Sequence, residues 1–167
     1  MNQKTDKRQA ILDGTIQLIA EKGFHGTAMS QVAKVAGVST GIIYHYFASK
    51  DDLIQAVYTD TKKALFANLL INDDPQLPMQ DRVQQIWHNM YRYCLENPEQ
   101  TAFLEQFEHS PYASEIDAYQ DDPLLQLVEG GIDVGIFKNL PLMVLYDLSL
   151  GIAFATAKHH INKTYIF

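Results

Sequence analysis

Residues 27–50 constrain the fold of this chain most, because they predict two short helices joined by a tight turn. The first helix is expected from about Ala28 to Ala36 and the second from Thr40 to Tyr46. Gly37 stands where the chain must turn sharply, and glycine adopts such conformations at low steric cost. Ser39 is a natural N-cap for the second helix. The arrangement is typical of a helix-turn-helix that binds DNA.

The second helix divides into an inward and an outward face. Ile43 and Phe47 are four residues apart and can share the inward face. The outward face then carries a hydroxyl, a glycine, a phenol and an imidazole, supplied by Thr40, Gly41, Tyr44 and His45. Such a face suits a recognition helix in a major groove. Lys50 begins the next helix, where the helix dipole disfavours a cation, and its position predicts a phosphate contact.

The charge of the chain is divided unevenly, although the net charge is −7. Residues 1–50 carry six Lys or Arg side chains and three acidic ones. Residues 51–167 carry seven Lys or Arg side chains and seventeen acidic ones. A mildly basic end on an acidic body is consistent with DNA binding by that end alone. No apolar run is long enough to span a membrane, and no secretory signal is visible. The lone Cys94 excludes a disulfide framework, so we expect a cytoplasmic protein.

The whole chain predicts an all-α fold, since every periodic segment has a helical period and no strand-like alternation is present. Beyond the helix-turn-helix, helices are expected at about 5–22, 50–70, 79–96, 99–109, 123–137 and 141–160, with a short helical turn within 112–122. We expect a DNA-binding domain at 1–50 and a regulatory and dimerisation domain at 51–167. The helix at 50–70 would connect them.

Two segments carry a resemblance to a known family. Gly37–Leu53 resembles the signature of the tetracycline-repressor (TetR) family of bacterial transcriptional regulators, and Ile11–Thr27 is similar to that family's first helix and following loop. A weaker resemblance continues through Gly130–Pro141. It implies a DNA-binding regulator that is not an enzyme and needs no cofactor. Ala28 and Ser30 depart from the commonest family pattern, so the base preference cannot be transferred.

The resemblance also implies which side chains contact double-stranded operator DNA. Groove contacts would come from Thr40, Gly41, Tyr44 and His45. Phosphate contacts would come from Tyr46 and Lys50, and phosphate or neighbouring base contacts from Thr27 and Ser30. The alternative for Tyr44 and Tyr46 is a place in the core of the small domain.

Aromatic residues gather between residues 87 and 119, where the resemblance implies a cavity for a small-molecule effector. We expect the apolar walls to include Trp87, Tyr91, Phe103 and Phe107, with His88 or Glu105 supplying polarity. The alternative is ordinary helix packing. No metal site is expected, because the available acids and histidines (Glu105, Glu108, His109, His159 and His160) lack a known metal-binding spacing.

The last two expected helices predict a homodimer interface. The helix at 141–160 spreads apolar residues widely and includes several small ones. Gly130, Gly131 and Gly135 would each weaken their helix by about 1 kcal/mol, and close packing would offset that cost. The alternative is burial within one subunit. Since no C-cap signal precedes Phe167, we expect either a short family member or further residues beyond this end.

The sequence therefore predicts a cytoplasmic homodimeric repressor that a small apolar or amphipathic effector releases from a palindromic operator. The alternative function is a helix-turn-helix regulator without a small-molecule inducer, controlled by a protein partner or acting constitutively. An enzyme is not expected, because the chain shows no nucleophile–base pair, phosphate-binding glycine loop or metal spacing.

Overall fold

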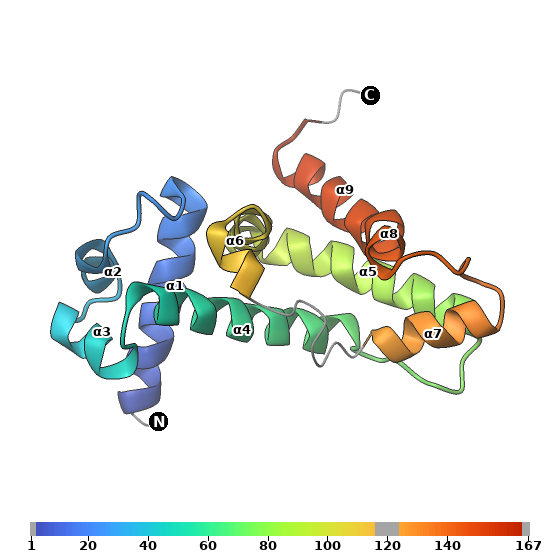
Figure 1. Ribbon diagram of the computed structural model, residues 1–167, viewed down its shortest axis with the longest axis horizontal. Helices are drawn as coiled ribbons and strands as arrows, with labels where there is room; N and C mark the ends of the chain where they lie inside the picture. Colours follow the sequence, from blue (N-terminus) through green and yellow to red (C-terminus); the bar gives the residue numbers. More distant parts are fainter. Residues whose placement is uncertain (1–2, 116–123, 165–167) are drawn as a thin grey trace. The chain divides into compact units, whose positions relative to one another are not determined.

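The computed structural model describes residues 3–115 and 124–164, and these residues form helices joined by loops (Figure 1). In chain order the elements are α1 (Gln3–Lys22), α2 (Met29–Val35), α3 (Thr40–Tyr46), α4 (Lys50–Leu69), α5 (Met79–Glu96), α6 (Pro98–Glu108), a 3₁₀ turn (Pro111–Glu115), α7 (Leu125–Asp133), α8 (Leu142–Tyr146), a π-helical segment (Asp147–Gly151) and α9 (Ile152–Ile161). The all-α prediction is confirmed. The short turn expected within 112–122 is the 3₁₀ turn, and residues 116–123 lie outside the described part.

The turn between α2 and α3 has the predicted local chemistry. Gly37 has a φ of +65°, in the left-handed region where glycine is favoured. The Ser39 hydroxyl accepts a hydrogen bond of 3.3 Å from the Ile42 amide, which caps α3. Both α2 and α3 contact α1, and they contact each other. These contacts hold α3 on a small three-helix core.

The chain divides into two compact units, and the division differs from the expected boundary at residue 50. The first unit contains the chain up to Lys62, together with the segment from Glu99 that includes most of α6 and the 3₁₀ turn. The second contains Lys63–Pro98 and the described residues from 124 onward. The boundary therefore falls inside α4, and α6 belongs with α1, α2 and α3 rather than with α5.

Aromatic packing explains why α6 belongs to the first unit. The ring of Phe24, in the loop after α1, lies 6.0 Å from that of Phe103 and 6.3 Å from that of Phe107. Tyr58 of α4 stacks on Phe107 with a centroid distance of 4.1 Å. Phe103 and Phe107 are buried in the same core as α1 and α3. Burial of two phenylalanine side chains stabilises this arrangement by roughly 3–6 kcal/mol.

The second unit is built on α5, which packs along α9. The buried Asn89 of α5 ties this helix to the carboxyl end of α4. Its amide donates hydrogen bonds of 3.0 Å to the carbonyls of Leu69 and Ile71, and its oxygen accepts bonds from Gln85 and Arg92. The buried amide therefore satisfies two carbonyl groups that the end of α4 leaves without helical partners.

A second polar contact fixes the loop between α4 and α5. Arg82 donates two hydrogen bonds of 2.8 Å to the carboxylate of Asp73. The hydrogen bond from Arg82 lowers the pKa of the Asp73 carboxyl below its usual value of 3.8. The pair therefore stabilises the fold at neutral pH, and this contribution is lost as acid protonates Asp73 below that value.

Two helices differ from their expected bounds. The helix expected at 123–137 ends at Asp133, because Gly135 adopts a φ of +78° and turns the chain back. The helix expected at 141–160 is interrupted by the π-helical segment. There the Ser149 hydroxyl donates a hydrogen bond of 2.5 Å to the Leu145 carbonyl, a side-chain bond that competes with the regular backbone ladder.

We predict that Asn89→Ala lowers the free energy of unfolding by about 2–4 kcal/mol, because it leaves buried carbonyl groups without donors. Urea denaturation followed by circular dichroism measures the change. Asn68→Ala is the matched control, since the Asn68 amide donates to the Ala64 carbonyl in a solvent-exposed bond. Equal losses in the two variants would contradict the assigned role of Asn89.

Candidate nucleic-acid interface and effector pocket

The exposed face of α3 carries the side chains expected to contact DNA. Ile43 and Phe47 are buried, as predicted, and Tyr44 is 53% exposed on the opposite face. Gly41 and His45 are exposed and Thr40 is half-buried. A Cβ at Gly41 would meet only the Ser39 hydroxyl, at 3.9 Å, so packing within the described protein does not require a glycine there. A close approach by another molecule would explain it.

The side chains before and after α3 differ in their access to solvent. Ser30 on α2 is exposed, and Tyr46 is half-buried against the core of the first unit. Thr27 is only 2% exposed, and its hydroxyl donates a hydrogen bond of 2.9 Å to the Gly23 carbonyl. This hydrogen bond holds the loop after α1, and the expected contact between Thr27 and DNA stays a prediction.

The amino end of α4 is held by reciprocal capping that places Lys50. The Ser49 hydroxyl accepts a hydrogen bond of 3.0 Å from the Asp52 amide, and the Asp52 carboxylate accepts one of 2.9 Å from the Ala48 amide. The Lys50 ammonium donates a bond of 2.6 Å to the Phe24 carbonyl. This bond gives the cation a partner in the first turn of the helix. An ammonium group has three donors, so the expected phosphate contact stays a prediction.

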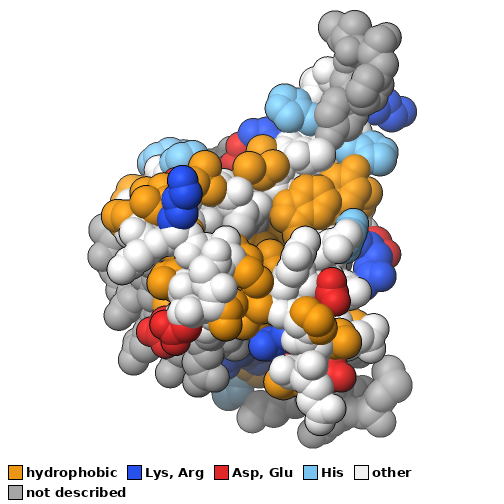
Figure 2. All heavy atoms as spheres, turned by 90° about the vertical axis from the view of Figure 1, so that its right-hand side faces the viewer, with side chains coloured by type: hydrophobic (Ala, Val, Ile, Leu, Met, Phe, Trp, Pro, Cys, Tyr) orange, Lys and Arg blue, Asp and Glu red, His pale blue; other side chains and the backbone are white. Residues whose placement is uncertain are grey.

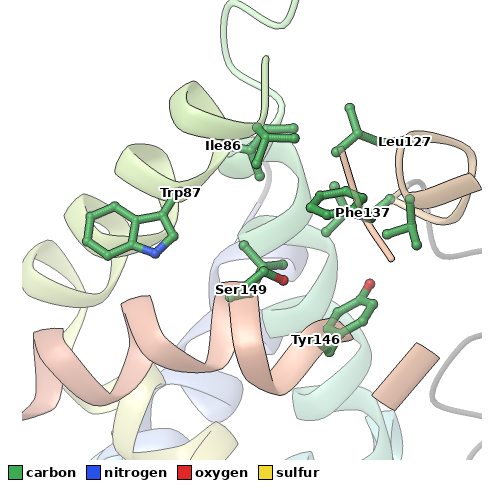
Figure 3. A pocket seen from close by; sticks show the side chains of 10 residues that line it. Ile86, Trp87, Leu127, Phe137, Tyr146 and Ser149 are labelled. Atoms are coloured by element: carbon green, nitrogen blue, oxygen red, sulfur yellow. The ribbon is translucent and has the colours of Figure 1, made fainter. Parts of the chain in front are cut away.

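The second unit contains an apolar cavity between α5, α7 and the segment from α8 into the π helix (Figure 3). Its volume is about 30 Å³. The lining side chains are almost all apolar, with single hydroxyls from a tyrosine and a serine: Val83, Ile86, Trp87, Leu124, Leu127, Val128, Phe137, Tyr146, Ser149 and Leu150. A concave apolar site with few polar groups is the usual character of a small-molecule site.

Of the expected effector contacts, only Trp87 lines this cavity. Tyr91 stacks on Trp87 at 5.8 Å, and its hydroxyl shares a hydrogen bond of 2.7 Å with Nδ1 of His160. His88 is exposed, with its ring edge-on to Trp87. These two side chains are next to a lining residue but do not belong to the lining.

The three expected contacts on α6 lie in the other unit. Phe103 and Phe107 are buried in the core of the first unit, and Glu105 is half-buried on the same helix. None of the three lines the cavity described above, and their expected effector contacts stay predictions. The apolar stripe that begins at Val83 and Ile86 was visible in the sequence, but the contributions of α7 and of the π-helical segment were not.

Within residues 3–115 and 124–164, no group of three His, Cys, Asp or Glu side chains is placed to hold a metal ion. Over the same ranges, no helix is both long and apolar enough to cross a bilayer.

Comparison with known families identifies the chain. Residues 11–57 match the model of the tetR family of bacterial regulatory proteins, and residues 78–167 match the tetracyclin repressor-like C-terminal domain. The second match alone covers more than half of the chain. The chain belongs to the TetR family. The members of this family are DNA-binding transcriptional regulators, and the family is not enzymatic.

Relatives of this TetR-family regulator agree in fold. An uncharacterized HTH-type transcriptional regulator of Haemophilus influenzae is 32% identical over 113 residues, which are 68% of this chain and 60% of that protein. The chain thus spans less than two thirds of the length of the curated relatives it matches. A crystal structure of a TetR-family regulator from the same organism is 27% identical, with a TM-score of 0.81 over 100% of this chain and 91% of that one.

A more distant structure was determined with a ligand. The transcriptional regulator FadR from Bacillus subtilis, in complex with stearoyl-CoA, is 18% identical to this chain. Its TM-score is 0.77, and the match covers 95% of this chain and 89% of that one. At this identity the likeness shows a common fold.

We predict that Lys50→Gln weakens operator binding about tenfold and reduces the slope of log Kd against log salt by about one per protomer, because a phosphate contact is lost. Fluorescence anisotropy at several salt concentrations measures both quantities. The control is Lys63→Gln, which removes an exposed cation from the same helix about 20 Å away. If the salt slope is unchanged and the thermal stability falls, the role of Lys50 is limited to its hydrogen bond with the Phe24 carbonyl.

Proposed function

We propose that this TetR-family protein is a homodimeric repressor that a small apolar or amphipathic effector releases from a palindromic operator. The observation that carries the proposal is the apolar cavity of the second unit, with two hydroxyl groups in its lining. Apolar walls would bind a hydrocarbon or ring portion of the effector, and the hydroxyls of Tyr146 and Ser149 would orient a polar group. Acyl-CoA binding by the structural relative FadR supports this class of effector.

The size of the cavity implies that effector binding requires a change of conformation. Small-molecule sites usually enclose roughly 300–1,000 Å³. The cavity of about 30 Å³ is therefore closed in this conformation. An effector would have to displace a side chain of the lining, or to separate α7 or the π-helical segment from α5. Short π segments occur often at functional sites, and here Ser149 and Leu150 bring this segment into the wall.

A route from the cavity to α4 runs through α5. Ile86 and Trp87 line the cavity, and Asn89 on the same helix holds the carboxyl end of α4. A displacement of α5 would therefore pull on α4, which begins at the capped turn after the recognition helix. For this coupling to release DNA, the effector must bind the DNA-free conformation more tightly than the DNA-bound one.

The proposed dimer interface is a stripe of exposed apolar side chains along α8, the π-helical segment and α9. Val144, Leu148 and Ile152 are four residues apart and are 38%, 59% and 50% exposed. Figure 2 shows hydrophobic side chains grouped on one face of the molecule, with charged side chains scattered between them. Large apolar side chains in such a stripe favour a covered interface. A two-fold dimer would place two recognition helices on half-sites roughly 34–36 Å apart.

The small cavity also favours a second candidate function. A regulator without a small-molecule inducer, controlled by a protein partner or acting constitutively, would need no larger space than the one described. The two candidates differ in whether any small molecule changes operator affinity, so one titration separates them.

We predict that a long-chain acyl-CoA or fatty acid weakens binding to DNA upstream of the protein's own gene at least tenfold, on the order of the coupling energies known for allosteric proteins. Fluorescence anisotropy of labelled DNA measures the release. Ser149→Ala removes a hydroxyl that would orient the effector without adding volume, so it should keep operator binding and weaken the response. If no compound in a broad panel of apolar molecules changes the operator affinity, the alternative without a small-molecule inducer is favoured.

We predict that Leu148→Glu converts the dimer to a monomer and weakens operator binding at least about 100-fold, because it places a charge at a desolvated contact. Sedimentation equilibrium measures the mass and anisotropy measures the affinity. Gln84→Glu adds the same charge at an exposed position on α5 and serves as the control. A Leu148→Glu variant that keeps the wild-type association constant would exclude this interface.

A further inference from the structure

The segment after α7 folds back so that one aromatic side chain enters the cavity. Gly135 has a φ of +78°, and its amide donates to the Ile132 carbonyl at 3.0 Å. The amides of Ile136 and Phe137 both donate to the Gly131 carbonyl, at 2.9 and 3.0 Å. These bonds form a Schellman-type helix end, which holds the backbone of Phe137 against α7. Its position therefore follows from local backbone geometry.

The ring of Phe137 lies directly on a glycine of α7. A Cβ added at Gly131 would be 2.4 Å from the ring atom Cδ2 and 2.7 Å from Cε2, distances that only a displaced ring could accommodate. At the neighbouring Gly130, a Cβ would meet only the flexible end of Met79, at 3.1 Å. A glycine within a helix costs roughly 1 kcal/mol relative to alanine. At position 131 that cost has a structural reason, which is the close approach of the Phe137 ring.

The same ring belongs to the cavity lining, where it points in among Ile86, Leu127 and Ser149 (Figure 3). The remaining space of about 30 Å³ holds about one water molecule and is far smaller than a phenyl group. We propose that Phe137 is an internal plug that occupies the place of the effector. It is then the specificity-determining residue of the site, because an effector must supply an apolar group at least as large as a benzyl group to replace it.

The Phe137 ring can move out of the cavity while the end of α7 stays folded. Phe137 is half-buried, so part of this residue already faces solvent. The Schellman bonds involve only backbone atoms, and rotation about the side-chain torsions would free the space while those bonds persist. The inference rests on the proposed effector function and makes it more specific: the effector exchanges with a ring of the protein itself instead of entering an open pocket.

The test uses iodobenzene as an apolar probe and Trp87 as the reporter. Trp87 is the only tryptophan of the chain and lines the cavity, so quenching by the iodine atom reports contact at this site. Iodobenzene is titrated into the full-length protein without DNA, for the wild type, Phe137→Ala, Gly131→Ala and Gly130→Ala. The first substitution removes the ring, and the second displaces it. The third is the matched control, with the same change of residue one position away.

We expect Phe137→Ala and Gly131→Ala to bind iodobenzene at least about tenfold more tightly than the wild type, and Gly130→Ala to bind it as the wild type does. Gly131→Ala tests the plug independently if Phe137→Ala folds poorly, because it retains the ring. Equal affinity in all four proteins would overturn the inference. Equal tightening in all three variants would also overturn it, since it would indicate general loosening of α7.

A separate measurement distinguishes failure of the plug from failure of the proposed function. Operator affinity of Phe137→Ala is measured with and without saturating iodobenzene. Quenching of Trp87 at low iodobenzene concentration, without any change in operator affinity, would contradict the effector function. It would not contradict the role of Phe137 as a plug. Release of the operator together with unchanged probe affinity in the variants would overturn the plug alone.

Discussion

The packing of α6 against the DNA-binding helices is the contact on which the rest of the organisation depends. Phe103 and Phe107 complete the core around Phe24, so α6 belongs to the first unit although α5 belongs to the second. The chain therefore crosses between the units three times: within α4, at the start of α6 and once more beyond the 3₁₀ turn. In the chain, α5 lies between the first two of these crossings.

Polar contacts at the two ends of α4 make this helix suited to transmit a displacement. Ser49 and Asp52 fix its amino end, whereas Asn89 fixes its carboxyl end to α5. Between these points lie 20 residues, or about 30 Å of helix. Under the proposed function, a movement imposed at one end of α4 would be carried to the other, because a helix of this length resists bending. The apolar cores anchor each unit, and these few polar contacts determine how α4 is held.

The cavity of the second unit is closed by the protein's own side chains. In the proposed exchange with the Phe137 ring, binding would replace one apolar contact with another. The net affinity would then depend on how much more surface the effector buries than the ring it replaces. Such a site rejects small apolar molecules and accepts larger ones. The hydroxyls of Tyr146 and Ser149 add a directional preference at its edge.

The sequence by itself determined the elements whose signals are local. Gly37, Ser39 and the Ser49 cap act through neighbouring atoms, and the predicted bounds of α3 and α5 are those observed. The exposed face of α3 followed from the spacing of Ile43 and Phe47. Only the tertiary structure decided which apolar residues share a core. Trp87 and Phe107 are alike in chemistry, yet they lie in different units, because burial is non-directional and depends on which distant helix supplies the partner surface. For the same reason the role of Phe137 was invisible, since it depends on a positive φ at Gly135 and on the absence of a Cβ at Gly131.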